Sequence, residues 1–153
     1  MRTETDTRRS TWTGAASALV HSRPAGPAPL GLALRGVAAA GVLLSADVHL
    51  ELWATGFKDI DTIGPLFMLN AIGGFVIGLA VLVWRHWLTL FLAAGFGVAT
   101  LVAFYVSATV GLFGLQETLG GVQQVTAEIA EYVAIAGAVA AFAAEWRRRP
   151  VQL

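Results

Sequence analysis

The sequence contains no cysteine, and this absence removes several kinds of chemistry from consideration. Disulfides, thiolate metal sites, lipoprotein anchors and thiol redox reactions all require that side chain. Membrane oxidoreductases that exchange electrons between thiols and quinones are therefore excluded.

Charge is also scarce, at 13% of the 153 residues, against about 25% in a typical soluble domain. The hydrophobic fraction is 56% and the mean hydropathy is +0.68. A water-soluble chain of this length cannot hide so much apolar surface in its interior. The formal net charge is zero, which gives no support for nucleic-acid binding. Lipid is therefore the expected solvent for most of the chain.

Four apolar stretches each approach the roughly 20 residues that a helix needs to cross a bilayer. They cover about 30–53, 65–84, 87–113 and 122–146. Pro65 falls in the first turn of the second stretch, where its missing N–H breaks no helical hydrogen bond. We therefore predict an all-α, polytopic membrane protein with a four-transmembrane-helix bundle. The domain would span 29–147, between a disordered basic leader over 1–28 and a short basic tail over 148–153.

The basic residues predict the orientation. Nine of the ten are arginines, and they fall in the leader, at Arg35, at Arg85 in the tight second connection, or in the run 147–149. The other two connections hold only Lys58. This pattern satisfies the positive-inside rule with both termini in the cytoplasm, in a bacterial inner membrane. Tryptophans mark four expected interfaces, as an aromatic belt requires, at Trp53, Trp84, Trp87 and Trp146.

Two alternatives to this topology are weaker. The first stretch could be a signal peptide cleaved near Ala46, but its basic region is too long and Leu44 is a poor residue before the cut. The second and third stretches could form a re-entrant pair, but each is long enough to span.

Small residues four apart predict where helices pack, because they let backbones approach closely inside lipid. Gly74 and Gly78 form a GxxxG motif on the second stretch. Small pairs recur on the other stretches at Gly36/Ala40, Ala93/Gly97 and Gly137/Ala141. Packing within the bundle is the favoured interpretation, and a dimer face is the alternative.

Ionisable groups inside hydrocarbon are costly, so each implies a partner or a purpose. With a rise of about 1.5 Å per residue, several polar residues fall at one depth, in the outer third of the membrane. The candidate site for a cation or proton comprises Asp47, His49, Glu51, Asn70, Glu128 and Glu131. Polar residues near the outer end of the third stretch lie at the same depth, at Tyr105, Ser107 and Thr109.

Spacing suggests how the acids meet. Asp47 and Glu51 share one helical face, and Glu128 and Glu131 share another. If the two faces meet, four carboxylates surround one outward-facing pocket that holds protons or a cation. His49 would add an imidazole ligand, although this mixed set selects no particular metal. The alternative is that these acids lie at the water interface or lock the bundle together.

No comparable cluster is expected at the inner end. Arg35 would snorkel toward the interface, and Glu145 lies beside the terminal arginines. A haem site is not expected, because His49 has no second histidine at its depth. The P-loop, dinucleotide-binding, HExxH and GxSxG motifs are absent, so we predict neither a catalytic residue nor a cofactor.

Three segments carry a resemblance to a known group. DVHLELW at 47–53, GFKDI at 56–60 and TIGPLFMLN at 62–70 resemble the small four-helix membrane proteins of actinobacteria. The similarity continues through VGLFG at 110–114 and covers roughly 30–147. Because no activity is assigned to that group, the resemblance implies a topology and no mechanism.

These observations predict a non-enzymatic integral membrane protein, an accessory or scaffold subunit of a larger membrane assembly. Its short connections leave no room for a soluble catalytic domain. The alternative is a small cation- or proton-coupled transporter or sensor that uses the outer acids. Expected contacts are the lipid bilayer and either a membrane-protein partner or a second copy of the chain, without nucleic acid.

Overall fold

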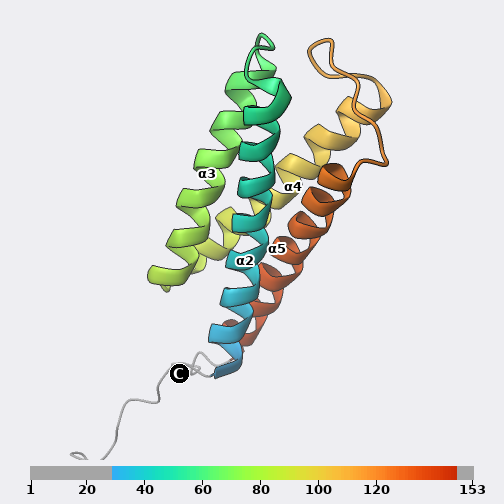
Figure 1. The fold of residues 1–153 in the computed structure, drawn as a ribbon. Coiled ribbons are helices and arrows are strands. Elements are labelled where there is room, and N and C mark those ends of the chain that lie inside the picture. Colours follow the sequence, from blue (N-terminus) through green and yellow to red (C-terminus); the bar gives the residue numbers. More distant parts are fainter. Residues whose placement is uncertain (1–28, 148–153) are drawn as a thin grey trace, which may run out of the picture.

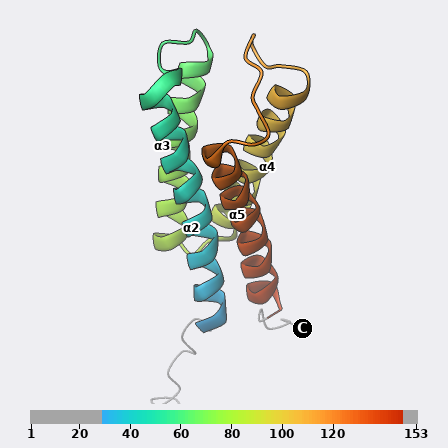
Figure 2. The same ribbon diagram turned by 45° about the vertical axis from the view of Figure 1, so that its right-hand side comes forward.

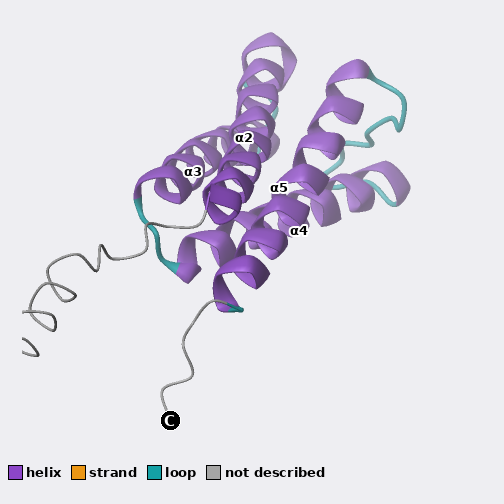
Figure 3. Ribbon diagram, turned by 90° about the horizontal axis from the view of Figure 1, so that it is seen from below, coloured by secondary structure: helices purple, strands orange, loops and turns teal. Residues whose placement is uncertain are grey.

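The computed structural model describes residues 29–147, and this part of the chain is built from helices and their connections (Figure 3). The expected leader over 1–28 and tail over 148–153 lie outside the described residues. The helices are α2 (Pro29–Leu52), the π-helical turn η1 (Trp53–Phe57), α3 (Ile63–Val83), α4 (Trp87–Thr109) and α5 (Val122–Trp146). Four of them are long and apolar enough to cross a membrane, which confirms the predicted all-α class and the four helices of membrane-spanning length.

One predicted helix end is wrong. The third stretch was expected to reach about Phe113, but α4 ends at Thr109. Gly111, Phe113 and Gly114 have φ angles of +83°, +50° and +82°, which belong to turns and not to right-handed helix. Hydropathy misses this break because the segment stays apolar while glycine frees its backbone.

The helices form two antiparallel pairs that open from one end. α2 is central, because it packs against α3, α4 and α5, whereas no Cα atom of α3 lies within 8 Å of one in α5. α3 and α4 are joined by the turn at 84–86 and diverge from it (Figures 1 and 2). We call this the turn end, which also holds the start of α2 and the end of α5. The opposite, loop end holds the α2–α3 and α4–α5 connections.

Small residues allow the helices to pack closely in the turn-end half of the bundle. A Cβ atom at Gly41 of α2 would lie 2.6 Å from the carbonyl oxygen of Ala130, and one at Gly137 of α5 would lie 2.8 Å from the nitrogen of Ala38. α2 and α5 are therefore in backbone contact, as close helix packing in lipid requires. The buried core of this half consists mainly of alanine and valine, at Ala38, Ala39, Val42, Val81, Leu90, Ala93, Ala134, Ala138 and Ala141.

The glycines singled out in the sequence differ in their surroundings. Gly74 and Gly78 both face α2, where added Cβ atoms would come within 2.8 Å of Ala46 and 2.7 Å of Leu43. The contacts of this GxxxG motif are therefore within the chain. The expectation for Gly36/Ala40 is wrong, because a Cβ at Gly36 would meet nothing within 4 Å.

Candidate functional site: a cavity at the loop end

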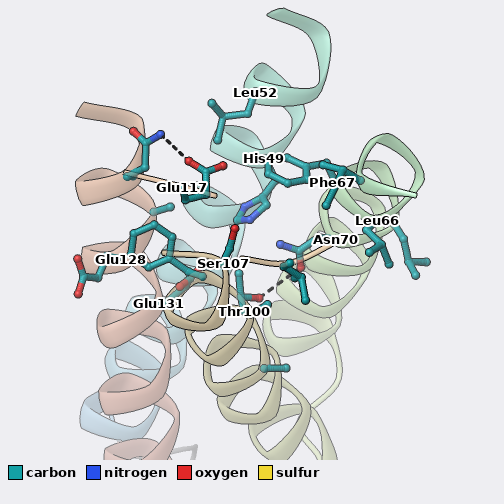
Figure 4. A pocket seen from close by; sticks show the side chains of 18 of the residues that line it. His49, Leu52, Leu66, Phe67, Asn70, Thr100, Ser107, Glu117, Glu128 and Glu131 are labelled. Atoms are coloured by element: carbon teal, nitrogen blue, oxygen red, sulfur yellow. Dashed lines mark hydrogen bonds between the residues drawn. The ribbon is translucent and has the colours of Figure 1, made fainter. Parts of the chain in front are cut away.

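A cavity of about 440 Å³ lies at the loop end, between the diverging helices (Figure 4). α3 and α4 supply facing walls, α2 and α5 supply the back, and the α4–α5 connection covers part of the opening. Most of the wall is apolar, with aromatic rings from Phe67 on α3 and from Phe96 and Phe104 on α4. A small number of polar groups in an apolar cavity is the usual composition of a ligand site.

The most buried polar group in this wall is the carboxyl of Glu131, a residue only 2% exposed. Ser45 of α2 donates its hydroxyl to Oε1 of Glu131 at 3.0 Å. The second oxygen, Oε2, has no hydrogen-bond partner in the described part of the chain. No fully enclosed side-chain polar atom there lacks a partner, so Oε2 opens into the cavity.

Ser45 also positions the imidazole of His49. Nδ1 of His49 lies 2.8 Å from the carbonyl oxygen of Ser45, one helical turn earlier. A carbonyl can only accept, so Nδ1 carries the proton and donates it. When the ring is neutral, Nε2 is left as an acceptor in the cavity wall. The ring is also held by Phe67, whose centroid lies 5.3 Å away.

Two further polar pairs lie in the cavity wall at other depths. The Oγ1 of Thr100 on α4 lies 3.4 Å from Oδ1 of Asn70 on α3, and thus spans the widening gap between these helices (Figure 4). Nearer the loop end, Gln124 donates from Nε2 to Oε2 of Glu117 at 3.2 Å. This second pair ties the α4–α5 connection to α5 beside the opening.

Glu128 takes a different position from Glu131, although both belong to α5. Its carboxylate accepts a hydrogen bond from the hydroxyl of Tyr105, which lies 3.2 Å from the hydroxyl of Tyr132. Figure 4 shows this carboxylate turned away from the cavity centre. Glu128 therefore contributes to the rim, and Glu131 is the acid that faces the interior.

The structure brings together part of the sequence-predicted site. The candidate residues that line the cavity are His49, Asn70, Glu128 and Glu131. Asp47 and Glu51 are exposed and do not line it. Asp47 follows Ser45 by two positions, which is a rotation of about 200° around the helix axis. Asp47 therefore points away from α5 when Ser45 faces it. The expected pocket of four carboxylates is not formed, and the described residues hold no cluster of three metal-binding side chains.

Sequence reasoning missed an ion pair at the turn end. Arg35 is 3% exposed and does not snorkel. Its Nε and Nη2 donate to the two carboxylate oxygens of Glu145, at 2.6 and 3.0 Å. The guanidinium also donates to the carbonyl of His86 at 3.2 Å and to the hydroxyl of Thr89 at 3.2 Å. The planar donors of arginine suit this combination of carboxylate and turn carbonyls.

This cluster, the Arg35–Glu145 clamp, joins α2, α4, α5 and the turn between α3 and α4. A signal for it was present in the sequence. Arg35 and Glu145 carry opposite charges at matching depth, near the start of α2 and the end of α5. Considering each residue separately at its own helix end concealed the pairing.

Comparison with known proteins finds no match among family models, curated proteins or solved structures. The resemblance to the actinobacterial group therefore stays a prediction. Inference about function starts from the geometry of the cavity and its one buried acid.

Proposed function

We propose that the chain is a multi-pass protein of a bacterial inner membrane, with both termini in the cytoplasm. The described arginines support this orientation, because Arg35, Arg85 and Arg147 all lie toward the turn end. The loop end carries Lys58 as its one basic residue and has several acids. Under the positive-inside rule, the turn end is cytoplasmic and the cavity faces outward.

We further propose that the cavity binds a proton or a cation at Glu131, in a transport or sensing role without catalysis. The supporting observation is the carboxyl of Glu131, which has one hydroxyl as its hydrogen-bond partner. Among residues 29–147, neither lysine nor arginine lines the cavity. A buried carboxylate without a counter-charge is costly, so either a proton or a bound cation must neutralise it.

Of the two functions expected from the sequence, this geometry favours the second. A scaffold subunit needs helix faces for association and gains nothing from a buried acid inside a cavity. The apolar surface of α3 gives no separate support for a partner, because a spanning helix presents such a surface to lipid anyway.

Access to Glu131 is one-sided. Between this residue and the turn end, α5 presents Ala134, Ala138 and Ala141 to the core, all fully or almost fully buried. No polar side chain of this buried core bridges Glu131 to the Arg35–Glu145 clamp. Protons and cations therefore reach the carboxyl from the loop end.

The proposal is tested by infrared difference spectroscopy of the protein in lipid nanodiscs. The carbonyl stretch of a protonated carboxylic acid is followed over about pH 4 to 10, with and without added cations. We expect one buried carboxyl whose band is lost when a cation binds. Glu131→Gln should abolish that band, because glutamine keeps the shape and the acceptor for Ser45 but cannot ionise.

The matched control is Glu128→Gln, which removes an acid one turn away on the same helix. It should leave the buried band in place. If Glu131→Gln keeps the wild-type spectrum, or if neither pH nor any cation changes the band, the proposed function is wrong.

A further inference from the structure

The cavity wall is poorly suited to an inorganic cation. Calcium takes six to eight oxygen ligands, and magnesium requires near-octahedral coordination. The cavity offers the free Oε2 of Glu131 and, when the His49 ring is neutral, its Nε2. The remaining polar groups lie at other depths of the cavity. The described residues contain no group of three side chains that could share a metal ion. One carboxylate balances a single positive charge.

The apolar wall instead suits a cation with an apolar body. Phe67 stacks on Phe57 with 4.6 Å between ring centroids, which fixes a rigid aromatic surface beside His49. Phe96 and Phe104 line the opposite wall on α4. Aromatic faces attract organic cations, most strongly where water is excluded. The volume of about 440 Å³ lies within the range of about 300–1,000 Å³ that is typical of pockets for drug-sized molecules.

The opening lies between helices as well as toward the loops. Leu66 and Leu69 of α3 line the cavity and remain 40% and 66% exposed, so this wall is open between α3 and α4. In the proposed orientation this gap faces the outer half of the bilayer, where a lipophilic molecule concentrates. Acids beside the opening, at Asp59, Asp61 and Glu117, favour positive charge there.

We infer that the ligand is a lipophilic organic monocation, with one protonated amine or quaternary centre paired with Glu131 and its apolar body between α3 and α4. This inference rests on the proposed function, since it names the class of cation that Glu131 holds. Three other titratable groups line the cavity with Glu131. They are His49 on α2, Glu128 on α5 and Glu117 in the α4–α5 connection, while α3 and α4 contribute none to the cavity.

The test uses tetraphenylphosphonium and tetraphenylborate, which share one shape and carry opposite charges. Binding to nanodiscs is measured by equilibrium dialysis, with empty nanodiscs subtracted. We expect saturable binding of one tetraphenylphosphonium per wild-type chain and none of tetraphenylborate. Glu131→Gln should weaken binding of the cation at least about tenfold, which corresponds to about 1.4 kcal/mol. Asp47→Asn, at an exposed acid outside the cavity wall, should bind as wild type does.

A second variant keeps the carboxyl and reduces the volume of the cavity. Ala103→Trp places a large side chain in the cavity wall of α4, so it should abolish tetraphenylphosphonium binding and leave the carboxyl band of Glu131 unchanged. Equal binding to wild type and Glu131→Gln would overturn the inference, as would undiminished binding to Ala103→Trp.

The infrared assay separates the two proposals. If sodium or another inorganic cation displaces the carboxyl band while tetraphenylphosphonium does not, the ligand class is wrong and the proposed function stands. If only pH changes the band, Glu131 binds protons and the ligand class is wrong. If neither pH nor any cation changes the band, both proposals are wrong.

Discussion

Replacing Arg35 by methionine should destabilise the protein more than changing any exposed arginine. The guanidinium contacts both oxygens of Glu145, at 2.6 and 3.0 Å, and also the carbonyls of the α3–α4 turn. The side chains of the pair are 4% and 38% exposed, so only the arginine is fully removed from water. Breaking a fully buried pair costs about 3–5 kcal/mol, and the partial exposure of Glu145 reduces our expectation to about 3 kcal/mol.

Conservative variants separate charge from geometry. Arg35→Lys keeps the charge without the planar donors, and Glu145→Gln keeps one acceptor, so each should cost about 1–2 kcal/mol. Arg85→Gln, in the exposed turn, is the control and should stay within about 0.5 kcal/mol of wild type. The free energy of unfolding is measured by titration with sodium dodecyl sulfate in mixed micelles. The reasoning is refuted if Arg35→Met matches the control, or if Arg35→Lys matches wild type.

Two further predictions concern packing and orientation. Gly41→Ala should lower the free energy of unfolding by about 1–3 kcal/mol, because the new Cβ would lie 2.6 Å from backbone atoms of α5. Gly36→Ala on the same helix should be neutral or slightly stabilising in the same unfolding assay. Because the chain has no native cysteine, single cysteines report topology directly. Asp59→Cys should react with a membrane-impermeant maleimide in intact cells, and Arg85→Cys only after permeabilisation; the reverse pattern would contradict the proposed orientation.

The number and position of the helices could be predicted because length and hydropathy act along the chain. The predicted fourth stretch, 122–146, coincides with α5, and the predicted second stretch begins within two residues of α3. The error at the end of α4 has a conformational cause, since the positive φ angles at 111, 113 and 114 do not alter hydropathy.

The rotation of each helix about its axis could not be predicted. In water the apolar face of a helix marks the core, but in lipid both the core and the surroundings are apolar. Depth alone therefore placed Asp47 and His49 together with Glu131. The structure keeps His49 in the cavity wall with Glu131 but separates Asp47, because Ser45 faces Glu131 and helical geometry then directs Asp47 outward. For the same reason, depth could identify Glu131 as a candidate but could not reveal that it is the acid that faces inward.

The two ends of the bundle differ in how tightly their helices pack, and this difference distinguishes a sensor from a transporter. No Cα atom of α3 lies within 8 Å of one in α5, so the angle of α3 to the bundle depends on its contacts with α2 and α4 and on the turn that Arg35 holds. The clamp and the close α2–α5 contact at Gly41 and Gly137 keep the cytoplasmic end shut in the proposed orientation. A transporter must open this end, and must therefore lose the clamp, at about 3 kcal/mol by the argument above, together with the close packing around the glycines.

A ligand can shift a conformational equilibrium only by its difference in affinity for the two states, and a shift from 1:99 to 99:1 needs about 5.5 kcal/mol. In a transporter, the ion pair between the ligand and Glu131 would have to supply this difference in affinity, although opening the other end also changes the shape of the cavity that holds the ligand. A sensor needs only a change in the angle between α3 and α4 at the loop end, where Thr100 and Asn70 form one long contact of 3.4 Å. The distribution of packing therefore favours sensing, and weakening the clamp by Arg35→Lys is the change that would favour transport.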